Sequence, residues 1–99
     1  METCRIDVWL WRARFAKTRS IAAAMVDAGA VRLTHNGVQT RVDKTSRSVH
    51  AGDLVTFVRV GRVTTVRIKA LGDRRGPPVE ARALYVELAP NDSPSIGDD

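Results

Sequence analysis

Apolar residues recur at helical spacing through the first thirty positions, in two successive segments. The first segment begins near Asp7, an acid that suits the positive end of a helix dipole. Its apolar residues form two stripes, one of Ile6, Leu10 and Ala13 and the other of Val8, Trp11 and Phe15. Because a helix that is apolar on two sides is covered on two sides, we expect it to pack against a second helix and a sheet. Trp9 borders these stripes, and we assign all three aromatic residues to the core rather than to base stacking.

The second segment carries signals for both ends of a helix. Thr18 is a good N-cap, and Gly29 stands where a helix would end in a left-handed residue. Between them, the predicted apolar stripe consists of Ile21, Ala24, Met25 and Ala28. The pattern therefore predicts a pair of short helices.

The rest of the chain alternates as strands do. Val31 and Leu33 alternate with polar residues, and Asn36-Gly37 is a strong signal for a two-residue hairpin. The β-branched runs 54–60 and 63–71 are joined near Gly61, so we expect a second hairpin. Residues 79–83 fit one helical turn, and residues 84–88 fit a last strand.

These elements predict an α+β fold of the alpha-L type, with two N-terminal helices packed on a small, mostly antiparallel sheet. We expect one domain over 5–89, with the helical pair and hairpin at 5–60 and additional strands at 63–89. Residues 1–4 should be a frayed lead-in. The loop at 73–78 should expose Arg74, Arg75 and Gly76. Residues 90–99 are polar and acidic, and we expect a disordered tail there.

Charge narrows the choice of partner. Among 99 residues there are 16 Lys and Arg against 11 Asp and Glu, giving a net charge of +5 and a pI near 10.3. This excess fits a polyanionic partner such as nucleic acid. No long apolar run indicates a signal peptide or membrane span, so we expect a cytoplasmic protein without a membrane partner.

The residues that support chemistry are few. The single cysteine, Cys4, excludes an intrachain disulfide and a tetracysteine zinc site. The two histidines show no metal-ligand spacing; His35 sits at a turn, and His50 should be structural or solvent-facing. No nucleophile–base–acid set or phosphate-binding glycine loop stands out. We therefore expect no catalysis, no metal and no cofactor.

The cationic residues concentrate on the helical pair and the hairpin that follows. Arginine suits phosphate because its planar fork can donate two hydrogen bonds. The sharpest expectation is phosphate capture by 17–19, where the second helix presents free N–H groups. The predicted RNA-binding residues are Arg5, Arg12, Arg14, Lys17, Thr18, Arg19, Arg32, His35, Asn36, Gln39, Arg41 and Lys44.

Each of these residues also has a plainer interpretation. Arg5 or Arg12 could pair with Asp7 or Asp27 and only solvate a helix face. Thr18 could serve as a cap alone, and His35 and Asn36 could be ordinary turn residues. A second basic spot at 74–75 could contact RNA or simply solvate its loop.

A dispersed pattern in the first half of the chain resembles the small RNA-binding domain named after ribosomal protein S four. It consists of Arg5-Ile6-Asp7, Leu10, Thr18-Arg19 with Ala22, Gly29, Val31, Asn36-Gly37 and Gly52-Asp53. Segment 7–19 is similar to the fifteen-kilodalton heat-shock branch of that family, and the region around Tyr85 fits it as well. That branch often carries a long basic C-terminal extension, whereas residues 91–99 are acidic.

The resemblance implies a bacterial, ribosome-associated RNA-binding protein. The branch binds free large ribosomal subunits that carry a stalled nascent chain with its tRNA, and it helps to recycle them after stress. We accordingly expect a non-catalytic factor that binds ribosomal RNA of the large subunit and is monomeric in solution. The alternatives are an accessory module acting with an RNA-modifying enzyme, a basic protein–protein adaptor and, more weakly, a DNA-binding protein.

Overall fold

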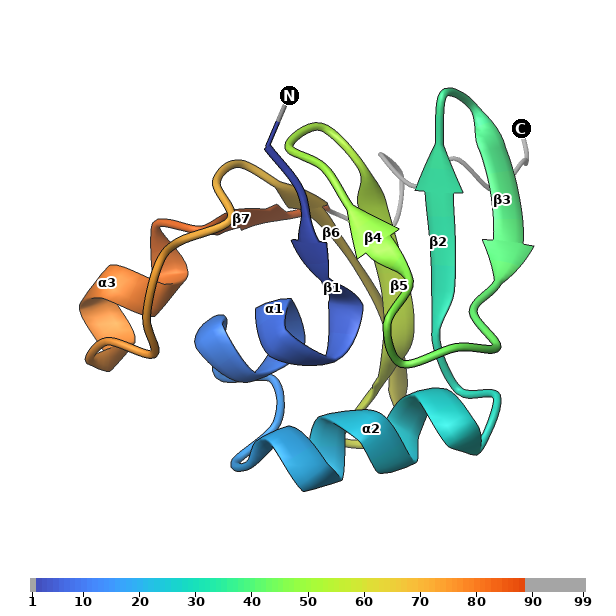
Figure 1. Cartoon of the computed structure of the whole chain (residues 1–99), viewed down its shortest axis with the longest axis horizontal. Helices are drawn as coiled ribbons and strands as arrows, with labels where there is room; N and C mark the ends of the chain where they lie inside the picture. Colours follow the sequence, from blue (N-terminus) through green and yellow to red (C-terminus); the bar gives the residue numbers. More distant parts are fainter. Residues whose placement is uncertain (1, 89–99) are drawn as a thin grey trace.

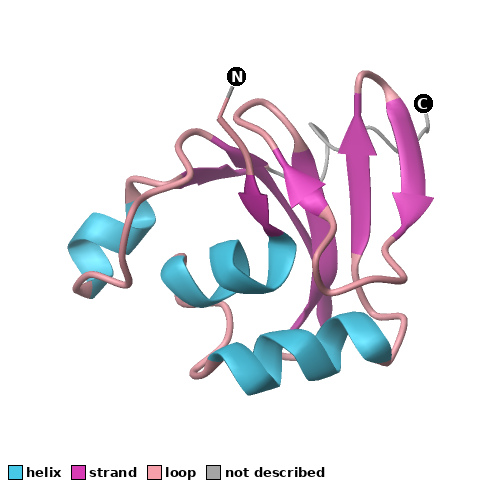
Figure 2. Ribbon diagram, viewed as in Figure 1, coloured by secondary structure: helices cyan, strands magenta, loops and turns pink. Residues whose placement is uncertain are grey.

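Among the described residues, a five-stranded antiparallel sheet, a two-stranded sheet and three short helices make up the fold (Figures 1 and 2). The computed structural model describes residues 2–88 of the chain. The helices are α1 (Ile6–Arg12), α2 (Arg19–Asp27) and α3 (Pro78–Arg82). The sheet order is β3-β2-β5-β6-β7, with β2 (Arg32–His35), β3 (Val38–Arg41), β5 (Leu54–Arg59), β6 (Arg62–Ile68) and β7 (Tyr85–Glu87). The predicted α+β class is confirmed.

Both predicted hairpins are present. Asn36 and Gly37 have φ angles of 52° and 80°, the left-handed conformations that a tight two-residue hairpin turn requires. Val60 and Gly61 turn the β5–β6 hairpin in the same way, with φ angles of 51° and 74°. A β-branched residue such as Val60 rarely adopts this conformation, so the turn is strained at a position that is fully open to solvent.

Helix α1 lies within the curve of the sheet and supplies the centre of the core (Figure 1). Ile6, Trp9 and Leu10 are fully buried. The indole N–H of Trp9 donates to the carbonyl of Ala70 at 3.0 Å, so its one polar atom is satisfied inside the core. The assignment of Trp9 to the core is confirmed.

Helix α2 begins and ends where predicted but buries a different face. The Thr18 hydroxyl accepts from the Ile21 N–H at 3.0 Å, and Gly29 follows the helix with a φ of 74°. The buried residues are Ala22 and Val26, whereas Ile21 is 46% exposed. An alanine-rich helix can pack with either of two faces. Packing against α1 buries the face that includes the small side chain of Ala22.

The predicted frayed lead-in is wrong at Cys4. Strand β1 (Cys4–Arg5) pairs antiparallel with β4 (Ser48–Val49), placing Cys4 opposite Val49. The N–H of Ile6 also donates to the Arg47 carbonyl at 2.8 Å. Backbone hydrogen bonds therefore fix the start of α1 to the segment before β5.

The predictions for the C-terminal helix and strand agree with the structure better than the prediction for the loop that precedes them. Helix α3 and strand β7 occupy the predicted positions. Within loop 73–78, however, Arg74 is exposed while Arg75 is half-buried and Gly76 is buried, because this loop packs against α1. The predicted disordered tail at 90–99 lies outside the described residues. Among residues 2–88, no helix has the length and apolar character needed to span a membrane.

Candidate nucleic-acid interface

Arg5, the first of the predicted RNA-binding residues, is held by a neighbouring acid. Its Nε and Nη2 atoms donate to Asp7 Oδ1 and Oδ2 at 3.0 and 2.9 Å, and the Asp7 side chain is buried. The hydrogen bonds to Asp7, together with its negative charge, raise the pKa of the Arg5 guanidinium above its ordinary value. This pairing is the plainer of the two sequence interpretations, and it neutralises the charge of Arg5.

Two further predicted arginines tie α1 to the loop at 71–76. Arg12 Nη1 donates to the carbonyls of Leu71 and Gly72 at 3.4 and 2.8 Å, and Arg14 Nε donates to the Gly76 carbonyl at 2.8 Å. Arg75 returns a hydrogen bond in the opposite direction, from its Nε to the Trp11 carbonyl at 3.1 Å. Guanidinium groups thus satisfy backbone acceptors that α1 and this loop would otherwise leave open.

The start of α2 presents its charges to solvent. Lys17, Thr18 and Arg19 are all exposed, and the first turn of the helix contains no acidic residue. Within residues 2–88, neither Lys17 nor Arg19 forms an ion pair. The helix dipole, the free N–H groups and two cationic side chains coincide here, so the geometry suits a phosphate.

A second cationic group lies on the β2–β3 hairpin. Arg32 and Arg41 are direct cross-strand partners, and Gln39 lies two residues from Arg41 on the same face. This is the face away from the helices, because the intervening Leu33 is buried. In the described part of the chain, no carboxylate pairs with Arg32 or Arg41.

Helix α2 separates the two groups. Its first turn carries Lys17 and Arg19, and its last turn lies beside the bases of β2 and β3 (Figure 1). Nine residues at 1.5 Å per residue make the helix about 14 Å long. Lys44, which is also exposed, follows β3 in the chain. Among the predicted RNA-binding residues, the exposed cations Lys17, Arg19, Arg32 and Arg41 thus lie at the two ends of one helix rather than at a single point.

Sequence reasoning missed four further exposed arginines, Arg59, Arg62, Arg67 and Arg82. Arg59 and Arg82 line a hollow of about 140 Å³ together with Arg14, and the Arg59 guanidinium lies 5.3 Å from the centre of the Phe15 ring. Arg67 belongs to the same sheet face as Arg32, because the registers join Arg32, Thr56 and Thr65 across three strands. Strand alternation around buried Val66 and Ile68 could have revealed Arg67; Arg59 and Arg82 meet only through the tertiary fold.

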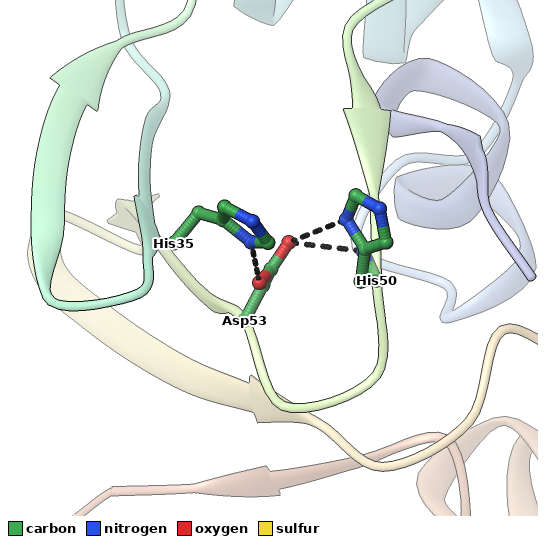
Figure 3. Close-up of side chains that lie close together, drawn as sticks. All are labelled: His35, His50 and Asp53. Atoms are coloured by element: carbon green, nitrogen blue, oxygen red, sulfur yellow. Dashed lines mark hydrogen bonds and ion pairs between the residues drawn. The ribbon is translucent and has the colours of Figure 1, made fainter. Parts of the chain in front are cut away.

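The polar residues at the hairpin tip form a separate cluster. His35 Nδ1 lies 2.6 Å from Asp53 Oδ1, and Asn36 Nδ2 lies 3.2 Å from His35 Nε2. A carboxylate only accepts, so His35 donates from Nδ1 and its Nε2 accepts from the Asn36 amide. His50 packs against His35 with ring centres 4.8 Å apart (Figure 3). The spacing of the two histidines in the sequence gave no sign of this cluster, because strand pairing brings them together.

A helical pair backed by an antiparallel sheet, with exposed cations at both ends of α2, defines a small nucleic-acid-binding domain. The S4 domain family model matches residues 4–55, just over half of the chain. The chain belongs to the S4 domain family.

The similar proteins are heat-shock proteins. Heat shock protein 15 homolog of Haemophilus influenzae is 40% identical over 83 residues, and heat shock protein 15 of Escherichia coli K12 is 39% identical over 85 residues. These matches cover 84% and 86% of the chain but only 60% of each relative's length. The trimeric structure of Vibrio cholerae heat shock protein 15 matches with a TM-score of 0.78 and 41% identity, covering 89% of this chain and 84% of that one.

Proposed function

We propose that this chain binds structured RNA through the exposed cations at the two ends of α2, and that its target is ribosomal RNA of the large subunit. The observation that carries the proposal is the cross-strand pair Arg32–Arg41. Like charges directly opposite on adjacent strands destabilise a sheet. A phosphate backbone across the pair would remove that repulsion and form charge-assisted hydrogen bonds.

The spacing of the two cationic groups supports a backbone partner rather than a single small anion. Helix α2, about 14 Å long, lies between them, a span that several successive phosphates of an RNA strand can cover. Arg12 and Arg14, which bind backbone carbonyls, and Arg5, which pairs with Asp7, position α1 and the loop at 71–76 instead. In this proposal their contribution to binding is indirect.

The biological role we propose follows from the relatives' names and from the family. The chain acts in the cytoplasm as a ribosome-associated factor of the heat-shock type, and it binds RNA without chemistry. We keep the prediction that it is monomeric in solution, although the similar protein from Vibrio cholerae is described as trimeric. Analytical ultracentrifugation of the purified chain measures this property directly.

Co-sedimentation with ribosomal subunits tests the proposal. Extract containing the chain is centrifuged at low and at moderate salt, and the bound RNA is sequenced. We expect large-subunit RNA to co-sediment with the chain, and the double variant Arg32→Glu/Arg41→Glu to remain in the supernatant. Lys69→Glu is the matched control, since Lys69 is exposed and follows β6 at the end of the sheet away from α2 (Figure 1). Equal sedimentation of the double variant and the wild type would contradict the proposal.

A further inference from the structure

The His35, His50 and Asp53 side chains converge although they are distant in sequence. His35 ends β2, whereas His50 and Asp53 flank the turn between β4 and β5. The antiparallel pairing of β2 with β5, in which Thr34 faces Leu54, brings the hairpin tip beside that turn. Figure 3 shows both imidazole rings directed at the carboxylate of Asp53.

The three side chains offer a set of metal ligands. One ligand atom from each residue lies within 4.8 Å of the other two. The Nδ1 atoms of His35 and His50 lie 2.6 and 3.5 Å from the Asp53 oxygens that they face. Ligands of a tetrahedral zinc ion lie about 2.0–2.2 Å from the metal, hence roughly 3.3 Å from one another. Rotation of the two rings by small amounts would therefore fit an ion between them.

One of these atoms, His50 Nδ1, has no hydrogen-bond partner among residues 2–88. This nitrogen is also buried. Asp53 is only 4% exposed, yet one of its oxygens already accepts from the His50 N–H at 2.9 Å, so its carboxylate is fixed in direction. A buried nitrogen without a hydrogen bond lowers the stability of the fold, unless a bound ion or another group from outside the protein becomes its partner.

The cluster is also accessible. It borders a groove of about 580 Å³ that Gly37, Gly52 and Arg67 help to line. The His35 and His50 side chains are 38% and 24% exposed, so an ion could reach the cluster and keep a water molecule as a fourth ligand. Two imidazole nitrogens and one carboxylate favour zinc or a similar transition metal over magnesium, which prefers oxygen ligands.

We propose that His35, His50 and Asp53 form a binding site for one Zn²⁺ ion or a chemically similar transition metal. The ion binds His35 Nδ1 in place of its proton, which moves to Nε2, and the Asn36 amide then turns its oxygen to accept from Nε2. The ion also binds the free Nδ1 of His50. It thereby links the tip of the β2–β3 hairpin to the β4–β5 turn. This inference does not depend on RNA binding, and its test uses no RNA.

Titration calorimetry with ZnCl₂ on the tag-free chain of 99 residues tests the site. The chain has only these two histidines and one cysteine, so few other strong zinc ligands exist. We expect one Zn²⁺ per chain, at least tenfold weaker binding in His50→Gln, and unchanged binding in Cys4→Ser. No heat with ZnCl₂, or full binding by His50→Gln, would overturn the proposal.

A measurement on the wild-type chain covers the case in which His50→Gln fails to fold. The side-chain ¹⁵N resonances of both histidines are followed by NMR while Zn²⁺ is added. We expect both Nδ1 resonances to shift to metal-bound values at one equivalent. Zinc binding with unmoved histidine resonances would place the ion elsewhere and overturn the inference.

Discussion

Arg32 on β2 lies directly opposite Arg41 on β3, and no carboxylate among residues 2–88 pairs with either guanidinium. The Arg41 side chain extends over Gly29, where an added Cβ would lie 3.5 Å from its Nη1. A protein selected for stability alone would favour opposite charges at such a pair of positions. The arrangement is understandable if a polyanion binds there.

The first prediction separates stability from binding at this pair. Arg32→Glu should stabilise the free chain by about 0.2–1 kcal/mol, because it replaces a like-charge pair with an opposite-charge pair. The same variant should bind ribosomal RNA more weakly than Arg32→Gln does. Thermal unfolding and a filter-binding assay measure the two effects. A variant that loses stability while keeping its RNA affinity would refute this interpretation.

The second prediction contrasts two arginines with different roles. Arg12→Met should destabilise the fold by about 1.5–3 kcal/mol, because Leu71 and Gly72 lose a charged hydrogen-bond donor. Arg19→Glu should change stability little, since Arg19 is exposed, but should weaken RNA binding. Urea unfolding and RNA titration of both variants provide the comparison. If folded Arg12→Met loses more affinity than Arg19→Glu, the division between structural and binding arginines is wrong.

The third prediction concerns the N-cap of α2. Thr18→Ala removes the acceptor of the Ile21 N–H and should cost about 0.5–2 kcal/mol. Thr18→Ser keeps a hydroxyl and serves as the matched control. Chemical denaturation measures both variants. Equal destabilisation by the two substitutions would show that the lost methyl group, rather than the cap, matters.

The sequence predicted most of the architecture because its local signals are strong. Thr18, Gly29 and Asn36-Gly37 each favour one backbone conformation, and each helix end or turn lies where they indicate. The β-branched runs on either side of Gly61 predicted the β5–β6 hairpin in the same way, and the strand pairing confirms it. The buried face of α2 was wrong, because alanines favour the helix without specifying which side packs.

Tertiary contacts explain what the sequence could not show in the candidate interface. The sequence shows that Arg12 and Arg14 are cationic. It does not show that they donate to backbone carbonyls 60 and 62 residues away. The His35–Asp53 contact likewise joins residues 18 apart and depends on strand pairing. The Arg5–Asp7 pair, two residues apart, was visible in the sequence as an alternative.

The fourth prediction follows from an exposed ion pair. Arg74 donates from Nε and Nη2 to Glu80 at 3.0 and 2.8 Å, and these hydrogen bonds lower the pKa of Glu80 below its ordinary value. The pair therefore contributes stability above the unfolded-state pKa, and this contribution is lost as pH falls through the lower folded-state pKa. NMR titration of the Glu80 carboxyl should show the low value, and Arg74→Gln should return it towards normal. An unchanged pKa in Arg74→Gln would contradict this assignment.

The salt dependence of RNA binding tests the central claim most directly. Affinity for a large-subunit ribosomal RNA hairpin is measured from low to moderate salt for the wild type, Arg32→Gln/Arg41→Gln and the control Lys69→Gln. Each lost phosphate contact should reduce the slope of log K against log salt by about 0.7–0.9. We predict a steep wild-type slope, a slope shallower by about 1.5 in the double variant, and no change in the control. A wild-type affinity that barely responds to salt, or equal slopes in all three proteins, would contradict the account.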